Sequence, residues 1–408
     1  MRFLFTAHTL PSHVRAMLPL ARAAQQAGHE VAIATGPELT QEVALHGFCP
    51  MTAGYNWRPD MDRDNTELGG ELGERLADDE TRYELGLRYF TGTPAGRMAD
   101  DLLDAVQSWR PDLIVRSQME FGGYLAAEKA GIPHASLAIS GGPASLFQPE
   151  RLAPLLAPHR RALGLPPDPT GATVYRRLHA VLMPADYDQA AAGLPRTRCY
   201  QHTSPQRAGE VLPAWLAGRP ADLPLVLVGF GTLAPLLTGD DRERLIGLMR
   251  SVLAALADLT CTAVVATGDG VPHDLFGPQP DHIHLETHVP QPLLLERAAL
   301  FVTHAGFNSV RESLEHGVPM VAVPLFAEQP HNAAQCEHAG VARSVRLPEA
   351  APSVLLEAFR QVLDDSSYQR RAAALRDRMA ALPPLKVLVE DLVDGRGADD
   401  ERAAPGDA

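Results

Sequence analysis

The sequence predicts an α/β protein of two doubly wound, Rossmann-like domains, and three observations support this prediction. The chain of 408 residues is long enough for two domains of ordinary size, each with its own core. Short apolar segments alternate with amphipathic helical patterns in both halves, which is typical of a parallel sheet covered by helices. Between the halves, residues 201–223 are rich in proline and lack periodicity, which indicates a linker.

The first domain, residues 1–200, begins with an apolar strand. We expect a helix from about His13 to Ala27, because its apolar residues recur at helical spacing and Gly28 ends it. Residues 55–82 are acidic and weakly patterned, which predicts an exposed excursion. The other elements expected in this domain are strands at 3–5, 31–34, 113–115 and 135–137, and helices at 95–109 and 122–130.

The second domain, residues 224–379, restarts the alternation at Leu225. Strands are expected at 225–228, 263–266, 300–303 and 320–323, and helices at 241–256, at 309–316 and from Pro330, a residue that suits a first helical turn. A last helix over 380–394 is predicted to pack back on the first domain, and the polar tail 395–408 is predicted to be disordered. Two such domains create a ligand-binding cleft at the carboxyl ends of their strands.

Composition excludes several classes of partner. The net charge is −14 and no basic stripe occurs, which argues against nucleic acid and anionic membranes. The four cysteines lie far apart without metal-site spacing, which favours free thiols in a reducing compartment. No apolar run approaches the roughly 18 residues of a membrane span, and the start does not resemble a signal peptide. We therefore expect a cytoplasmic protein, monomeric or homodimeric.

An anion site is predicted in the second domain, where the segment His304-Ala305-Gly306-Phe307-Asn308-Ser309 joins a buried strand to a helix. Gly306 allows close approach of a ligand, and Ser309 and its neighbours present free N–H groups at a helix start, where the macrodipole favours an anion. His304 and Ser309 add side-chain donors. Taken alone, the segment also fits a glycine turn with Ser309 as an ordinary N-cap.

Two further loops follow strands of the same domain. The turn Gly229-Phe230-Gly231-Thr232 can donate N–H and hydroxyl groups to the same phosphates. The loop from Pro324 places Glu328 beside Gln329, a pair that suits vicinal sugar hydroxyls, because the carboxylate accepts and the amide both donates and accepts. Each loop alone can be a solvated tip, but three polar loops at strand ends favour a binding site.

These segments resemble the nucleotide-sugar signature of family 1 glycosyltransferases, which are inverting enzymes of the GT-B fold. The resemblance is carried by His288-Val289-Pro290-Gln291, the segment from His304 to Ser309, Glu312, Gly317-Val318-Pro319, Pro324 and Glu328-Gln329. It implies a UDP- or dTDP-sugar donor, a small hydrophobic natural product as acceptor, no cofactor and no obligatory metal ion.

The resemblance also implies a role for each site residue. Thr232, with the turn at Gly231, and His304, Asn308 and Ser309, with Gly306, would hold the diphosphate. Val289 and Gln291 would hold the base and ribose, Glu312 the ribose hydroxyls, and Glu328 with Gln329 the sugar. Many members have Trp at the position of His288, where it stacks on the base. Histidine also stacks, so the choice between uracil and thymine stays open.

A general base is required because the acceptor hydroxyl has a pKa far above 7. His13 stands at the expected helix start after the first strand, with Ser12 before it as a good N-cap. In the family a histidine at this place is the base, so His13 is our candidate, with His8 as the alternative. Without the signature, a capping-region histidine without chemistry would be the better interpretation.

The acidic partner that orients such a base is less clear. In relatives it falls at the position of Ser117, and here Glu120 is the nearest candidate. Either Glu120 substitutes, or His13 works with weaker support, or the enzyme is impaired. The pattern Asp62-Arg63-Asp64, used by metal-dependent transferases, follows no strand and is given little weight.

Two rival hypotheses remain at this point. A sugar nucleotide epimerase would share the diphosphate site but need no acceptor, and a non-catalytic relative would bind the nucleotide sugar without turnover. The acceptor itself is not specified by the sequence. The family binds it mostly through first-domain loops, here about 55–90 and 140–185, with the aromatic residues Trp57, Tyr83, Tyr89, Phe90 and Phe147.

Overall fold

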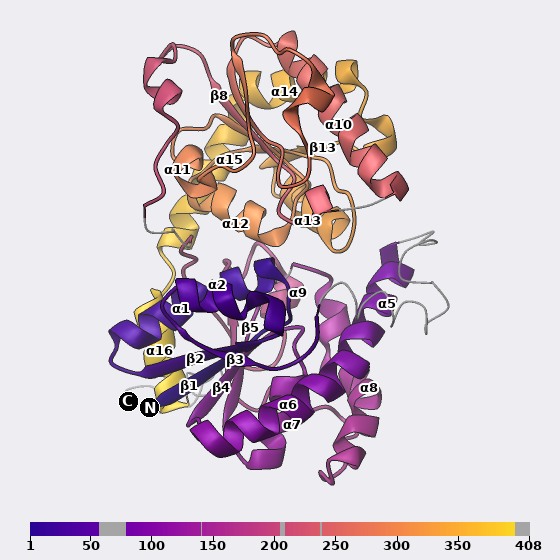
Figure 1. Cartoon of the computed structure of the whole chain (residues 1–408), viewed down its shortest axis with the longest axis vertical. Helices are drawn as coiled ribbons and strands as arrows, with labels where there is room; N and C mark the ends of the chain where they lie inside the picture. Colours follow the sequence, from indigo (N-terminus) through magenta and orange to yellow (C-terminus); the bar gives the residue numbers. More distant parts are fainter. Residues whose placement is uncertain (57–78, 140, 205–208, 237–238, 396–408) are drawn as a thin grey trace, which may run out of the picture. The chain divides into compact units, whose positions relative to one another are not determined.

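The computed structural model describes residues 1–56, 79–139, 141–204, 209–236 and 239–395. The chain forms two compact units, unit 1 of residues 1–205 with 382–408, and unit 2 of residues 206–381 (Figure 1). Each unit contains a fully parallel sheet flanked by helices. The predicted α/β fold of the GT-B type is therefore confirmed.

The sheet of unit 1 has seven strands in the order β3-β2-β1-β4-β5-β6-β7. Its strands are β1 Arg2–Thr6, β2 Glu30–Thr35, β3 Cys49–Thr52, β4 Leu113–Ser117, β5 His134–Leu137, β6 His179–Val181 and β7 Thr197–Cys199. Its helices are α1 Pro11–Gln26, α2 Thr40–Leu45, α5 Asp79–Thr91, α6 Thr93–Trp109, α7 Gly122–Ala130, α8 Pro149–Ala162, α9 Gln189–Ala192 and α16 Leu385–Asp394.

Both faces of this sheet are apolar, as the crossover helices of a parallel sheet require. Phe3 and Phe5 belong to the cluster that includes α1 and α16, whereas Leu4 belongs to the cluster that includes α6 and α7. The C-terminal helix α16 is tied to β7, because Asp391 accepts hydrogen bonds at 2.7 Å from Arg198 and from the hydroxyl of Tyr200.

The sheet of unit 2 has six strands in the order β10-β9-β8-β11-β12-β13, the arrangement of a Rossmann domain. Its strands are β8 Leu225–Gly229, β9 Thr262–Ala266, β10 Ile283–Glu286, β11 Leu300–Thr303, β12 Met320–Ala322 and β13 Ala342–Ser344. Its helices are α10 Gly239–Ala257, α11 Gln291–Leu295, α12 Phe307–Glu315, α13 Gln329–His338, α14 Pro352–Asp364 and α15 Ser366–Ala380.

The strand order reverses once in each sheet, between β1 and β4 in unit 1 and between β8 and β11 in unit 2. Open α/β sheets bind ligands at such a switch point, beyond the carboxyl ends of the strands. The predicted base His13 and its alternative His8 follow β1, and Glu120 follows β4. The predicted diphosphate loops follow β8 and β11. The strand order therefore gathers the candidate residues at the two switch points.

The structure corrects three local expectations. Helix α1 begins at Pro11, and its N-cap is Leu10, so Ser12 is its second residue and not its N-cap. The predicted linker contains a short helical turn, Ala214–Gly218, and Trp215 stacks on His284 with ring centroids 3.6 Å apart. The predicted last helix, 380–394, is observed as α16 and begins only at Leu385, because Pro383 and Pro384 directly precede it.

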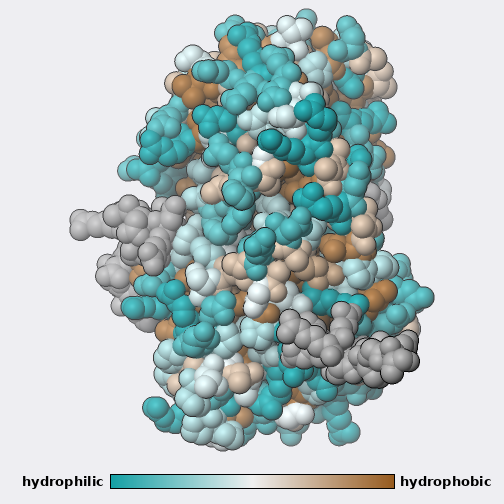
Figure 2. Space-filling model, turned by 180° about the vertical axis from the view of Figure 1, so that it is seen from behind, coloured by the Kyte–Doolittle hydropathy of each residue, from teal (hydrophilic) through white to brown (hydrophobic). Residues whose placement is uncertain are grey.

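Among the residues that the structure describes, six large apolar side chains are exposed. On the face shown in Figure 2, hydrophilic residues cover most of the surface and hydrophobic residues are scattered among them. Over the residues that the structure describes, no helix combines the length and the apolar character needed to cross a membrane.

Candidate functional site

His304 occupies the switch point of unit 2, and its ring is packed against two glycines. A Cβ atom at Gly231 would lie 2.7 Å from Cε1 and Nε2 of the ring, and one at Gly306 would lie closer still to Nε2. Gly231 also has a φ of +78°, which glycine alone adopts without strain. The two predicted glycines are therefore needed to seat the histidine, besides allowing close approach of a ligand.

The environment of His304 keeps its ring neutral. Burial lowers the pKa of His304 to about 4, although the Gly229 carbonyl accepts a hydrogen bond from the ring and raises it again in part. At neutral pH the single ring proton is thus directed at Gly229, and the other nitrogen carries a lone pair. The expected role of His304 as a phosphate donor therefore requires the ring to gain a second proton.

The first turn of helix α12 receives no capping hydrogen bond from its own N-cap residue, which is a glycine. The helix begins at Phe307 with Gly306 as N-cap, and Ser309 is its third residue, buried but close to the helix start. The side-chain oxygen of Asn308 accepts a hydrogen bond from Arg311, one turn further along the same helix. The N–H groups of this turn and the helix dipole favour an anion, so the site keeps the features on which the predicted anion site depends, and its occupancy stays a prediction.

The loop after β12 brings Glu328 and Gln329 beside this helix start. Burial raises the pKa of the Glu328 carboxyl, while its own N–H and the N–H of Phe307 stabilise the charged form and partly offset that rise. The side-chain oxygen of Gln329 accepts hydrogen bonds from the backbone of Leu325 at 2.9 Å and of Phe326 at 3.1 Å. Because this oxygen shapes the loop, the amide NH₂ group is the part of Gln329 that can reach a sugar.

The residues expected to hold the base and ribose also come together. Nε2 of Gln291, at the start of α11, donates to Glu312 of α12 at 2.7 Å. Val289 is partly exposed, and the exposed ring of His288 is held by Asp269, with 2.9 Å between Nε2 and Oδ1. Thr232 is exposed at the end of β8. Sequence reasoning missed Asp269, which carries no motif signal.

Sequence reasoning also missed Asn332. Its side-chain nitrogen donates to the Ala305 carbonyl at 3.0 Å, and Asn332 is buried. The residue lies three positions after Gln329 on α13, so the helical spacing of polar residues could have indicated it.

The switch point of unit 1 holds Glu120 in a fully buried position. Both carboxylate oxygens accept a hydrogen bond from the Gly123 N–H at 2.9 Å, and Thr6 donates to one of them at 2.5 Å. A Cβ at Gly123 would lie 2.5 Å from the same carboxylate. Glu120 therefore caps the first turn of α7.

The proposed pair of His13 and Glu120 does not form a direct contact. Among the described residues, no hydrogen bond or ion pair joins the two side chains, because Thr6 and the start of α7 engage the carboxylate. Burial and, second, the neighbouring His8 lower the pKa of His13 to about 3. The Nδ1 atom of His13 is buried without a hydrogen-bond partner in the described part of the chain.

His8 is the neighbour of His13 on which the charge of Glu120 acts. The ring centroids of His8 and His13 are 5.9 Å apart, and the Met119 carbonyl accepts a hydrogen bond from Nε2 of His8 at 2.9 Å. Burial lowers the pKa of His8, and the charge of Glu120 raises it in part. Glu120 thus influences the histidine pair through its field on His8.

Aromatic side chains line this pair on one side. The ring centroid of Phe90 lies 4.7 Å from His8 and 6.4 Å from His13, and the hydroxyls of Tyr89 and Tyr55 are hydrogen-bonded at 3.1 Å. Phe147 belongs to the core cluster around Leu125, and Tyr83 and Phe90 pack against that cluster. Trp57 and the Asp62-Arg63-Asp64 pattern lie outside the described residues. Within those that are described, no three His, Cys, Asp or Glu side chains lie close enough to hold a metal ion.

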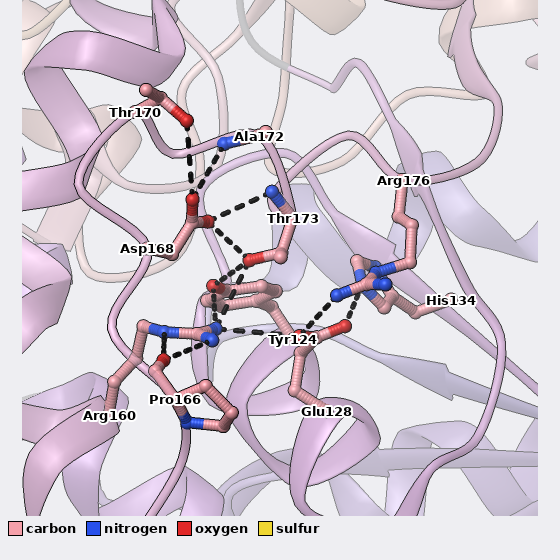
Figure 3. Close-up of polar contacts among 10 residues, drawn as sticks. All are labelled: Tyr124, Glu128, His134, Arg160, Pro166, Asp168, Thr170, Ala172, Thr173 and Arg176. Atoms are coloured by element: carbon pink, nitrogen blue, oxygen red, sulfur yellow. Dashed lines mark hydrogen bonds and ion pairs between the residues drawn. The ribbon is translucent and has the colours of Figure 1, made fainter.

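Part of the expected acceptor region is held by a polar network (Figure 3). Arg160 of α8 donates to the Pro166 carbonyl at 2.8 Å and to the Tyr124 hydroxyl at 2.5 Å. Asp168 accepts from the backbone and the hydroxyl of Thr173 at 2.9 and 2.5 Å, and Thr173 contacts Tyr124 at 2.6 Å. The connection between α8 and β6 is therefore fixed against α7.

Known proteins share both halves of this architecture. The profile of the erythromycin biosynthesis protein CIII-like N-terminal domain matches residues 22–167, and that of UDP-glucoronosyl and UDP-glucosyl transferase matches residues 250–388. The 3-alpha-mycarosylerythronolide B desosaminyl transferase of Saccharopolyspora erythraea is 27% identical, with 97% of this chain and 99% of that protein covered. The tylactone mycaminosyltransferase of Streptomyces fradiae is 28% identical, with 96% and 92% covered.

Solved structures show the same fold. The glycosyltransferase SsfS6 of Streptomyces sp. SF2575, complexed with thymidine diphosphate, superposes with a TM-score of 0.76 at 24% identity, covering 97% of this chain and 99% of that one. SnogD of Streptomyces nogalater gives a TM-score of 0.75 at 24% identity, with the same coverage. The two family models and the curated relatives together show that the chain is a glycosyltransferase, similar in sequence and fold to the family 1, GT-B natural-product glycosyltransferases.

Proposed function

We propose that this protein transfers a sugar from a UDP- or dTDP-sugar to a hydroxyl group of a small hydrophobic natural product, with inversion at the anomeric carbon. The observation that carries the proposal is the switch point of unit 2. There His304, seated by two glycines, adjoins the start of α12, which has glycine at its N-cap, and Glu312 of the same helix pairs with Gln291. The names of the relatives, a desosaminyl transferase and a mycaminosyltransferase, describe sugar transfer and support it. We expect this reaction in the cytoplasm.

In the proposed reaction, His13 accepts the proton of the acceptor hydroxyl as its oxygen attacks the anomeric carbon. The bond from that carbon to the diphosphate breaks on the opposite face, and the nucleoside diphosphate leaves. The first turn of α12 stabilises the charge that develops on the leaving diphosphate, and a protonated His304 adds to it. Because the chain supplies these groups, we expect no obligatory metal ion, so activity should persist in EDTA.

The environment of His13 bears on its role as base. Its lowered pKa leaves the ring unprotonated at neutral pH, as a base must be, but also makes it a weak proton acceptor. The negative charge of Glu120 raises the pKa of the adjacent His8 and so stabilises a proton on the pair of His8 and His13. His8 therefore stays the alternative base, and substitution of each histidine separates the two.

The test is a turnover assay of the full chain with UDP- and dTDP-sugars and a panel of hydrophobic acceptors, followed by mass spectrometry. The native chain should add one hexose or deoxyhexose, and His13→Ala should lose that product, while NMR of the product should show an inverted anomeric centre. His8→Ala, at the second histidine, is the matched comparison. Loss of product only in His8→Ala would transfer the role of base to His8.

Two other outcomes would contradict the proposal. A donor that is altered without any acceptor would indicate the epimerase hypothesis. Micromolar donor binding without turnover for every acceptor would indicate a non-catalytic relative, a role consistent with the missing direct contact between His13 and Glu120.

A further inference from the structure

Asn332 connects two of the donor-site loops without belonging to either. It lies on α13, after the Glu328-Gln329 loop, and its side-chain nitrogen donates to the carbonyl oxygen of Ala305 at 3.0 Å. Both residues are buried, Asn332 being 2% exposed and Ala305 1%. A buried amide that donates to a single backbone carbonyl holds that carbonyl in one direction, because leaving either group unpaired is costly.

The backbone of Ala305 is strained. Its φ is +60°, in the left-handed region, which an alanine adopts only at a cost because of its Cβ atom. The N–H of Ala305 is held as well, since it donates to the Thr303 hydroxyl at 3.3 Å. Asn332 and Thr303 thus hold the peptide groups on both sides of this residue in its strained conformation.

Ala305 stands between the two parts of the diphosphate site. His304 precedes it, with its ring seated against Gly231 and Gly306, and Gly306 follows it as the N-cap of α12. If Ala305 relaxed to a right-handed or extended conformation, the chain could no longer join β11 to α12 with both groups in their present places. Strain of this kind persists only where surrounding contacts impose it, and it clusters at ligand sites.

We infer that Asn332 is a positioning residue of the donor site. It touches no ligand and acts by holding Ala305 in the left-handed conformation, which keeps His304 between the glycines and the first N–H groups of α12 directed at the diphosphate. The inference rests on the proposed function, because it assigns a role toward the donor that the function requires.

The experiment measures binding of dTDP and UDP to the full chain by calorimetry, together with thermal unfolding. Asn332→Ala should lower the affinity for the tighter-binding of the two nucleotides about tenfold or more, the loss expected when a set of backbone donors is misplaced. A glycine at position 305 adopts the left-handed conformation without strain. When Asn332→Ala is combined with Ala305→Gly, the nucleotide dissociation constant should therefore rise less than about threefold above that of Ala305→Gly alone. Asn332→Leu, which keeps the branch at Cγ but has no hydrogen-bond donor, replaces the alanine variant if that variant does not fold.

Ser313→Ala is the matched control. The Ser313 hydroxyl is fully buried on the same unit and donates to the Val318 carbonyl at 2.9 Å, at the far end of α12. Its removal should lower the unfolding temperature about as much as Asn332→Ala does, but leave the nucleotide dissociation constant unchanged. A loss of binding in Ser313→Ala equal to that in Asn332→Ala would overturn the inference, because general destabilisation would then explain both.

The remaining outcomes are also decisive. Wild-type binding in Asn332→Ala, or an undiminished loss in the Ala305→Gly background, would overturn the inference and leave the proposed donor site intact. If the wild-type chain bound neither nucleoside diphosphate, the proposed function and this inference would fall together.

Discussion

The two switch points of this protein have the same topology but opposite chemistry at the helix that follows. In unit 1, the first turn of α7 is satisfied by the buried carboxylate of Glu120, which the chain itself supplies. In unit 2, the N-cap residue Gly306 supplies no side chain to the first turn of α12, and the half-buried carboxylate of Glu328 accepts a hydrogen bond from the N–H of Phe307. A helix start that holds a fully buried anion of its own has no room for another, whereas a more open helix start can also receive a diphosphate. The same fold thus makes a structural cap in one unit and the proposed donor site in the other.

The largest effect on nucleotide binding should follow from adding one methyl group at the start of α12. Gly306→Ala places a Cβ atom against the His304 ring, and the overpacking should weaken nucleoside diphosphate binding by up to about a hundredfold. Calorimetry measures the dissociation constant. Gly218→Ala is the control, because its Cβ would meet no atom within 4 Å. Undiminished affinity in Gly306→Ala would show that the packing of the His304 ring against Gly306 is not required for nucleotide binding.

The corresponding change in unit 1 should lower the stability of the protein but leave its affinity for the donor unchanged. Glu120→Ala removes the carboxylate that accepts hydrogen bonds from the Gly123 N–H and the Thr6 hydroxyl. Its loss should lower the free energy of unfolding by about 1–3 kcal/mol. Urea unfolding measures the loss, and nucleotide affinity should stay unchanged. A large fall in nucleotide affinity would contradict the division of roles between the two switch points.

The neutral state of His304 makes donor binding depend on pH. The pKa of about 4 in the free protein should rise when a diphosphate lies beside the ring. Between the two pKa values the complex holds one proton more than the free protein, so affinity should fall as pH rises, by at most about tenfold per unit. Calorimetry in buffers of different ionisation enthalpy should show proton uptake on binding. Its absence would mean that the ring stays neutral in the complex.

The smallest effect concerns Glu328, a partial counterpart of Glu120. Its carboxylate lies near the N–H of Phe307, where a diphosphate would also bind. Glu328→Gln should therefore tighten binding of the free nucleoside diphosphate about two- to threefold, because one repelling charge is removed. Binding of the nucleotide sugar should not gain in the same way if Glu328 accepts sugar hydroxyls. An equal gain for both ligands would exclude that role.

Periodicity predicted most strands and helices of the two sheets, including α7 over Gly122–Ala130 and β11 over Leu300–Thr303. Short elements were missed, such as β6 and β7, which have three residues each and carry too little pattern. Helix α8 was missed because Pro154 and Pro158 interrupt its pattern. Both prolines lie on the exposed side, where water can satisfy the carbonyls that their missing N–H groups leave free.

The sequence by itself determined the fold class, the three polar loops of the proposed donor site and the candidate histidine, because apolar periodicity and short motifs are local properties. Only the tertiary structure decided which side chains are engaged. Glu120 meets Thr6 across 114 positions, and Asn332 meets Ala305 across 27. Such partners are set by strand order and helix packing, and the burial that shifts the pKa values of His13 and His304 comes from the same packing. Contacts of this kind leave no signal in the spacing of residues along the chain.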